Sequence, residues 1–193
     1  MSIITGETPT SVDVGRTVVM EENQRLSAST DHASWDRAAL TITSARAIFV
    51  IGNGRTGLAL QMAAMRLMHL GLQVHVVGEV TAPAIGEGDV LIAGSGSGST
   101  SSVVSAADTA RAVRASVIAV TTAPESVLAQ KADQVLLLPA ADKQDHSGAI
   151  TRQYAGSLFE QAVLLSFDAL FHALWHNADQ SAERLWSRHA NLG

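Results

Sequence analysis

The sequence predicts an α/β domain, in which parallel strands alternate with helices around one sheet. After Arg46, short runs rich in β-branched residues and bounded by glycine alternate with longer segments of helical spacing. The length of 193 residues suits one domain. Aromatic residues make up only 4% of a chain that is 47% hydrophobic. This aliphatic bias is typical of strands buried between closely packed helices.

Five strands are expected in a core domain that we place at residues 46–177. The strand-like runs are residues 47–51, 73–77, 90–93, 116–121 and 134–139. Helical stretches follow the first, third and fourth of these runs, at residues 56–70, 100–114 and 126–132. Because a helix that connects two strands of one sheet leaves them parallel, this order predicts a parallel sheet with crossover helices.

The two ends of the chain are predicted to be helical. Residues 1–45 carry scattered apolar positions, which predicts one or two helices with a break near residues 29–32 that pack on the core or on a partner subunit. The helix at 156–177 has an apolar face too broad for a lone surface helix, so part of it should meet another subunit in a homo-oligomer. The tail, 178–193, is expected to add a short helix without chemistry.

The composition excludes several functional classes. The chain has no cysteine, which excludes disulfides, thiolate metal sites and thiol nucleophiles. Its 13 Lys+Arg against 18 Asp+Glu give a net charge of −5, so no basic field attracts nucleic acid. The N-terminus lacks the pattern of a signal peptide, and no uninterrupted apolar run approaches the ~18 residues of a membrane span. We therefore expect a cytoplasmic protein that binds neither nucleic acid nor membrane.

Two glycine-rich loops are the best candidates for binding chemistry. GNGRTG, residues 52–57, follows the first strand and matches GxGxxG, and Glu79 follows the second strand about where a ribose-binding carboxylate would stand. A dinucleotide site is therefore one interpretation. GSGSGSTSS, residues 94–102, follows the third strand. Because parallel strands end at one edge, both loops should meet there, where helix N-termini favour an anion.

The chemistry of the loops favours a phosphate monoester on a small metabolite. They contain hydroxyl groups but no lysine of a P-loop, and no acidic pair suggests a magnesium site. We expect no metal and no organic cofactor. The alternatives are that residues 94–102 form a Gly/Ser linker and that Arg55 is an ordinary surface residue in a salt bridge. The expected substrate-binding residues are Gly54, Arg55, Thr56, Ser95, Gly96, Ser97 and Thr100.

The loops also carry a resemblance to a known family. Together with MRLMHLGLQVHVVGE, TAPAI and GSLFEQ, in this order, they resemble the 6-phospho-3-hexuloisomerase family of sugar isomerase (SIS) domain proteins over about residues 50–175. The resemblance implies a single SIS domain, with a five-stranded parallel sheet in a three-layer αβα sandwich, and a tetramer with the dimer as its unit. It also implies conversion of D-arabino-3-hexulose 6-phosphate to fructose 6-phosphate in the ribulose monophosphate pathway of formaldehyde fixation, with hexulose-6-phosphate synthase as functional partner.

The resemblance further implies roles for individual residues. The phosphate would be held by Thr56, Ser95, Ser97 and Thr100, and the catalytic base would be Glu160 of GSLFEQ. One carboxylate can take the proton from C2 and return it to C3 through a 2,3-enediolate.

His69 of LMHLG is a second catalytic candidate, for protonating sugar oxygens or opening the fructose ring. It ends a helix of ~20 Å, at ~1.5 Å per residue, so it would serve a neighbouring subunit's site. A histidine that caps the helix C-terminus is the alternative.

Two departures from the family pattern leave substrate preference open. Ser99 stands where the family commonly has the glutamate of GSGET, and Asn53 and Thr56 stand in a loop that commonly reads GAGRSG. Two other functions are considered. A sugar-phosphate sensor with the same cradle would need a DNA-binding domain of ~70 residues, whereas about 45 residues precede the first strand. Another phosphosugar aldose–ketose isomerase would use the same base and cradle.

Overall fold

A five-stranded parallel sheet forms the centre of the molecule. The computed structural model describes residues 11–145 and 147–192. The sheet order is β2-β1-β3-β4-β5, and every neighbouring pair is parallel. The strands are β1 (Ile48–Gly52), β2 (Val74–Val76), β3 (Val90–Gly94), β4 (Ser116–Thr121) and β5 (Gln134–Leu137). All five expected strands are confirmed, with ends that differ by up to two residues.

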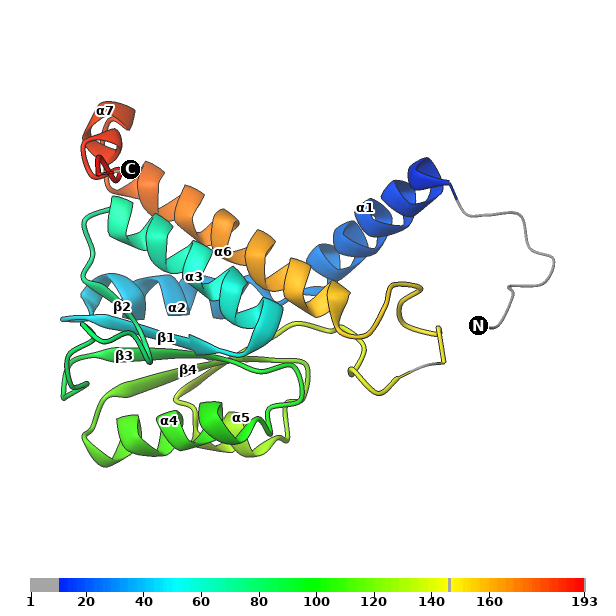
Figure 1. Ribbon diagram of the computed structural model, residues 1–193, viewed down its shortest axis with the longest axis horizontal. Helices are drawn as coiled ribbons and strands as arrows, with labels where there is room; N and C mark the ends of the chain where they lie inside the picture. Colours follow the sequence, from blue (N-terminus) through cyan, green and yellow to red (C-terminus); the bar gives the residue numbers. More distant parts are fainter. Residues whose placement is uncertain (1–10, 146, 193) are drawn as a thin grey trace.

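Helices cover both faces of the sheet, so the three-layer αβα architecture is confirmed (Figure 1). One face carries α2 (His32–Ser44), α3 (Gly54–His69) and α6 (Ser157–Asn177) over one cluster of buried side chains. The other face carries α4 (Ser101–Ala112) and α5 (Val127–Lys131) over a second cluster. The helix that follows β1 begins two residues earlier than expected, so Arg55 and Thr56 lie in its first turn.

The first ten residues of the expected N-terminal segment lie outside the described ranges. After them come α1 (Val12–Ser29) and α2, separated at Thr30 and Asp31 as the sequence predicted. Asp31 caps α2 by accepting a hydrogen bond from the Ala33 amide. α2 packs against β5 and α6, and α1 contacts α6 and then projects away from the sheet (Figure 1). α2 is thus part of the core between the sheet and α6, whereas α1 joins the core where it meets α6.

α6 is the one helix in the described part of the chain that is long and apolar enough to cross a membrane. It lies along α3 and also contacts α1 and α2. Phe159 and Val163 on this helix are almost fully buried, and Phe167 packs edge-on against Trp35 of α2. These contacts are those of a core helix. Its exposed residues, such as Leu165, lie on the remaining face.

The tail forms a short helix, α7 (Ala182–Trp186), as expected. It is held against the C-terminal end of α3. The Gln180 amide donates to the Leu70 carbonyl at 3.1 Å, and Arg188 donates to the His69 carbonyl at 2.9 Å. The C-terminal segment therefore closes the end of the molecule opposite to the carboxyl edge of the sheet.

Candidate functional site

The candidate site lies at the carboxyl edge of the sheet, between β1 and β3, where the order of the strands reverses. β1 and β3 are neighbours, but β1 leads through α3 to β2 on one side, while β3 leads through α4 to β4 on the other. In open parallel sheets, such a switch point leaves a crevice outside the carboxyl ends of the strands, and ligands bind there. Gly52 and Gly94 are in register, so both glycine-rich loops start at the same level.

The first loop packs α3 tightly against β1. A Cβ atom on Gly57 would lie 2.3 Å from the Gly52 carbonyl oxygen, so only glycine fits at residue 57. Thr56 is buried beside this contact, with its methyl group facing Gly94 of β3. The close packing of α3 on β1 thus accounts for Gly52 and Gly57. A dinucleotide-binding motif would have glycine at the same two positions, so these glycines do not by themselves indicate a dinucleotide.

The second loop is fixed by hydroxyl hydrogen bonds. The side-chain oxygens of Ser95 and Thr100 lie 2.7 Å apart and close its ends. The hydroxyls of Thr121 and Thr122, at the end of β4, both donate to the Gly96 carbonyl at 2.9 Å. The loop is therefore an ordered turn, and the linker alternative is wrong.

Within the same loop, Ser97 is exposed and accepts a hydrogen bond from the Ser99 hydroxyl at 3.0 Å. Gly98 has a positive φ of +60°, and a Cβ there would lie 1.9 Å from the Ser126 hydroxyl oxygen. The tight turn at Gly98 therefore leaves the Ser97 side chain at the surface.

Three helix N-termini at this edge lack side-chain caps. The N-cap residues of α3, α4 and α6, which are Asn53, Thr100 and Gly156, make no side-chain cap hydrogen bond, whereas the other four helices of the described chain are capped by serine or aspartate. The Asn53 amide donates instead to the Ser102 hydroxyl at 3.0 Å, which ties α3 to α4. Uncapped backbone N–H groups and the positive end of each helix dipole favour an anion here.

Glu160 lies in the first turn of α6, where it faces two cations. Its side chain is only 8% exposed. Arg55 Nη1 is 3.1 Å from Glu160 Oε2, and Lys143 Nζ is 3.8 Å from Oε1. Arg55 also donates to the Ser157 hydroxyl at 3.3 Å. The structure therefore brings Arg55 and Glu160, which are distant in sequence, into direct contact.

Phe159 connects Glu160 to the serine loop. A Cβ on Gly96 would lie 3.3 Å from the Phe159 ring, so the loop backbone packs directly on the residue before Glu160. Two of the segments singled out in the sequence, GSGSGSTSS and GSLFEQ, are thus in contact. The expected binding residues in the two loops and the expected base all lie at one edge of the sheet.

A buried carboxylate that the sequence analysis missed holds the segment before α6. Glu22 of α1 accepts hydrogen bonds from the Thr151 hydroxyl at 2.6 Å, the Arg152 amide at 2.9 Å and the Gln153 side chain at 3.0 Å. Burial favours a higher pKa for Glu22, but these hydrogen bonds and the Arg25 guanidinium outweigh it and hold the pKa below its usual value.

The Glu22 network continues to the residue next to Glu160. Gln161 donates to Gln153 at 2.8 Å and accepts from Asn23 at 2.6 Å. These hydrogen bonds fix α1, α6 and the segment that precedes α6 to one another at Gln161, the residue after the expected base. Helical spacing could have found Glu22 as a buried residue, because it is three residues after Val19 and four before Leu26 and so shares the buried face of α1, whereas Glu21 is exposed.

His69 lies away from this site. It ends α3, whereas Arg55 begins the same helix, so ~20 Å separates them at ~1.5 Å per residue. Its side chain is buried and its ring stacks on His189 at 4.0 Å. Burial, followed by the positive charges of His189, Arg66 and Arg188, lowers the pKa of His69. In residues 11–145 and 147–192, no group of three or more His, Asp or Glu is placed to hold a metal ion.

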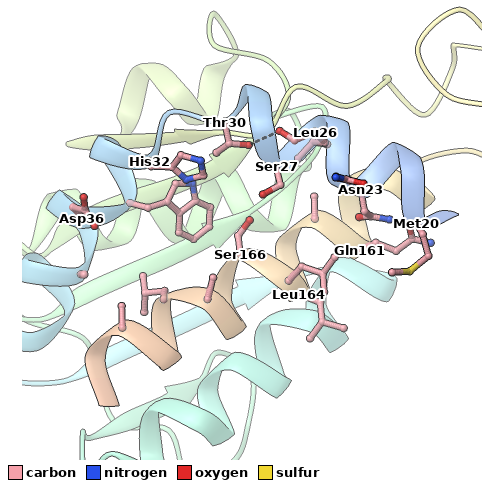
Figure 2. A pocket seen from close by; sticks show the side chains of 18 of the residues that line it. Met20, Asn23, Leu26, Ser27, Thr30, His32, Asp36, Gln161, Leu164 and Ser166 are labelled. Carbon is pink, nitrogen blue, oxygen red and sulfur yellow. Dashed lines mark hydrogen bonds between the residues drawn. The ribbon is translucent and has the colours of Figure 1, made fainter. Parts of the chain in front are cut away.

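A large apolar cavity of the described chain lies elsewhere. It is a groove of about 730 Å³ between α1, α2 and α6, and it is lined mainly by apolar side chains (Figure 2). Its polar lining residues include Asn23 and Gln161, which belong to the Glu22 network. The groove and the loop edge therefore meet at the first turns of α6 but are different features.

Comparison with known proteins agrees with this geometry. Residues 41–173 match the family model described as the SIS domain. The chain is 50% identical over 175 residues to a 3-hexulose-6-phosphate isomerase of Mycobacterium gastri, which covers 91% of this chain and 88% of that protein. It is 38% identical to the 3-hexulose-6-phosphate isomerase of Bacillus subtilis, over 90% of this chain and 95% of the relative.

A solved structure also has the same fold as this chain. The Methanococcus jannaschii protein, whose crystal structure inferred a function of 3-hexulose-6-phosphate isomerase, is 28% identical and superposes with a TM-score of 0.81, over 92% of this chain and 98% of that one. The fold and the two glycine-rich loops define a SIS-domain protein. The chain belongs to the SIS-domain family and, within it, to the group that contains the 3-hexulose-6-phosphate isomerases. That name is a synonym of 6-phospho-3-hexuloisomerase, so the resemblance found in the sequence is confirmed.

Proposed function

We propose that this protein is an isomerase that converts D-arabino-3-hexulose 6-phosphate to fructose 6-phosphate. The observation that carries the proposal is the contact between Arg55 and Glu160 at an edge where both hydroxyl-rich loops end. The Mycobacterium gastri and Bacillus subtilis relatives, which match nine tenths of the chain, support the choice of substrate. The reaction suits the ribulose monophosphate pathway, with hexulose-6-phosphate synthase as the enzyme that supplies the substrate.

The phosphate group of the substrate is proposed to lie in the cradle of uncapped helix ends. Thr56, Ser95, Ser97 and Thr100 would contribute hydroxyl groups, and Arg55 would contribute a positive charge. Backbone N–H groups at Gly54 and Gly96 would add further donors. A cradle of this kind binds a dianion mainly through directed hydrogen bonds, because it holds one arginine and no lysine of its own.

Glu160 is proposed to be the base that moves the carbonyl group. It would take the proton from C2, and the C3 carbonyl oxygen would take up negative charge. The proton would then return to C3 while the hydroxyl proton of O2 passes to O3, which leaves the carbonyl at C2. Burial of Glu160 beneath Arg55 supports this role, because the carboxylate has a fixed position and little contact with water. The reaction is proton transfer alone, so the proposal includes no metal or organic cofactor.

His69 is proposed to act only in the site of a neighbouring subunit. It is buried beneath His189 in a single chain, so the C-terminal segment has to move before this ring can reach a substrate. That requirement makes the helix-capping role of His69, close to the C-terminal end of α3, the competing explanation.

A homo-oligomer is proposed, with a dimer as unit and a tetramer as the full assembly. We infer that a second copy of the chain fills the groove between α1, α2 and α6 (Figure 2). Met20 and Leu165 are 65% and 52% exposed on its lining, and Trp35 Nε1 and Asn23 Oδ1 are buried there without a hydrogen-bond partner among residues 11–145 and 147–192. Because the same helices supply both the groove and the exposed apolar side chains, the surface can pair with itself about a two-fold axis.

Light scattering tests the assembly. Leu165→Glu should lower the molecular mass in solution, because a charge in an apolar contact is poorly tolerated. Val113→Glu, at the end of α4, should leave the mass unchanged. A single-chain mass for the unsubstituted protein would contradict this proposal.

A location in the cytoplasm is also part of the proposed function, in keeping with a sugar-phosphate substrate.

A coupled assay tests the reaction itself. The synthase makes 3-hexulose 6-phosphate in place from formaldehyde and ribulose 5-phosphate, a chelator then removes the free metal, and fructose 6-phosphate is followed as NADPH through glucose 6-phosphate. Fast NADPH formation that depends on this protein is expected. No signal, together with thermal stabilisation by other sugar phosphates, would point to another phosphosugar isomerase or to a sensor.

A further inference from the structure

The segment between β5 and α6 brings a second cation to the site. Lys143 lies in this segment, and its Nζ is 3.8 Å from Glu160 Oε1, whereas Arg55 Nη1 is 3.1 Å from the other carboxylate oxygen, Oε2. The side chain is 55% exposed, and the distance to Glu160 exceeds that of a hydrogen bond. The ammonium group is therefore beside the expected base and has donors to offer a ligand.

The path of the Lys143 side chain is fixed by its surroundings. Its methylene groups cross the backbone at Gly156, where a Cβ would lie 2.9 Å from Lys143 Cε. Gly156 has a positive φ of +78° and precedes the first turn of α6. Further along the same segment, Thr151 and Arg152 are bound to Glu22. The segment that carries Lys143 is thus held at both the helix end and α1.

The two cations have different relations to the phosphate cradle. Arg55 lies in the first turn of α3, which supplies the cradle with free N–H groups. Lys143 comes from outside both glycine-rich loops. For Glu160 to reach the hydrogen on C2, the C2–C3 end of the sugar has to lie within hydrogen-bonding distance of its carboxylate. An ammonium 3.8 Å from that carboxylate is then beside the oxygens on C2 and C3.

We propose that Lys143 is a catalytic residue that binds the oxygen on C3 of the sugar and stabilises the negative charge that forms there. The proposal rests on the proposed function. As Glu160 takes the C2 proton, the electrons of the C2–H bond form the C2–C3 double bond, and the carbonyl electron pair moves onto the C3 oxygen. Lys143 donates a hydrogen bond to this oxygen. The proton then returns to C3, the hydroxyl proton of O2 passes to O3, and Lys143 ends with the protons it began with.

Kinetics give the first test. Lys143→Met should lower kcat by ~10²-fold, the usual loss for removing one donor to a developing oxyanion, while KM changes by less than ~3-fold. Lys143→Arg should keep more activity than Lys143→Met, because it retains a charged donor. The matched control is Lys131→Met, which breaks a surface pair with Asp108 and should leave kcat unchanged. A kcat for Lys143→Met within ~3-fold of the unsubstituted protein would overturn the proposal.

Binding gives a second test that needs no turnover. Lys131 and Lys143 are the two lysines of the chain, so reductive methylation with ¹³C gives two lysine signals in an NMR spectrum, both still charged. Fructose 6-phosphate should shift the Lys143 signal, assigned with Lys143→Met, and inorganic phosphate alone should shift it much less. An equal shift with both ligands would make Lys143 a phosphate ligand, and no shift with fructose 6-phosphate would remove it from the site. Either result overturns the proposal, whereas failure of the proposed function shows as no turnover in the unsubstituted protein.

Discussion

Arg55 Nη1 lies 3.1 Å from Glu160 Oε2, so one ion pair joins the first turn of α3 to the first turn of α6. The arginine side chain is 60% exposed and the glutamate only 8%, which leaves the guanidinium between solvent and the carboxylate. Because α3 and α6 pack along each other, the pair lies on a rigid support. The expected base is therefore held in place by an expected phosphate-binding residue.

Replacement of Glu160 by glutamine should abolish turnover and spare binding. An amide cannot accept the proton from C2, so Glu160→Gln should lower kcat by at least ~10³-fold. Thermal stabilisation by fructose 6-phosphate should persist, because the phosphate cradle is intact. Glu125→Gln, an exposed site near α5, is the control. Equal loss of binding and turnover would show that Glu160 is not the base.

Gly98 should not tolerate a side chain. Its φ is +60°, and a Cβ at this position would lie 1.9 Å from Ser126 Oγ, so Gly98→Ala should lower both the melting temperature and the affinity for phosphate ligands. Gly148→Ala is a matched control, since Gly148 has a φ of +71° and no atom of the described residues lies near its Cβ position. The control should show only the strain of the left-handed backbone, about 1 kcal/mol. Similar losses in both variants would contradict the close contact at Gly98.

Glu22 should contribute to stability in a pH-dependent way. Its pKa in the folded protein lies below its usual value, so its contribution is present above about pH 4.3 and is lost as the pH falls through the folded pKa. Glu22→Gln should cost about 1–3 kcal/mol at neutral pH, because three hydrogen bonds lose a charged acceptor. Urea unfolding at pH 7 and pH 4 checks both points. The neighbouring Glu21→Gln, which is exposed, should behave like the unsubstituted protein.

His69 should make the protein less stable in mild acid. Its pKa is lowered first by burial and then by the charges of His189, Arg66 and Arg188, so protonation favours the unfolded chain. Its contribution is complete above about pH 6.5 and is lost as the pH falls toward the folded pKa. Urea unfolding at pH 7.5 and 5.5 should show a smaller loss of stability in His69→Gln than in His176→Gln, an exposed control near the end of α6. An unchanged loss in His69→Gln would contradict the burial of this ring.

Much of the fold could be predicted from the sequence, because local patterns determine it. β4 was placed without error at Ser116–Thr121, since a β-branched run between polar residues leaves little choice. The break between α1 and α2 was expected at Ser29 to His32, because four consecutive polar residues interrupt the helical spacing of apolar positions. The strand order β2-β1-β3-β4-β5 was not predicted, because it depends on which face each crossover helix covers.

The site was predictable only where short motifs mark it. The two loops and Glu160 stand in motifs with a family resemblance, and their contact follows from the topology of the sheet. Lys143 and Glu22 were missed, because the role of each is recognised only by its contacts with residues distant in sequence, Glu160 in one case and Thr151 to Gln153 in the other. No local periodicity reports such contacts.

The position of hydrogen exchange in fructose 6-phosphate tests the central claim most directly. In the reverse direction, Glu160 takes the proton from C3. Over many turnovers the protonated carboxyl exchanges with solvent, so prolonged incubation in D₂O should replace that hydrogen with deuterium, which removes the H3 signal from a proton NMR spectrum. The two hydrogens on C1 should remain, and Glu160→Gln should leave H3 in place. Deuterium at C1 would identify an aldose–ketose isomerase instead, and retention of both H1 and H3 through prolonged incubation would contradict a base at Glu160 that acts through a 2,3-enediolate.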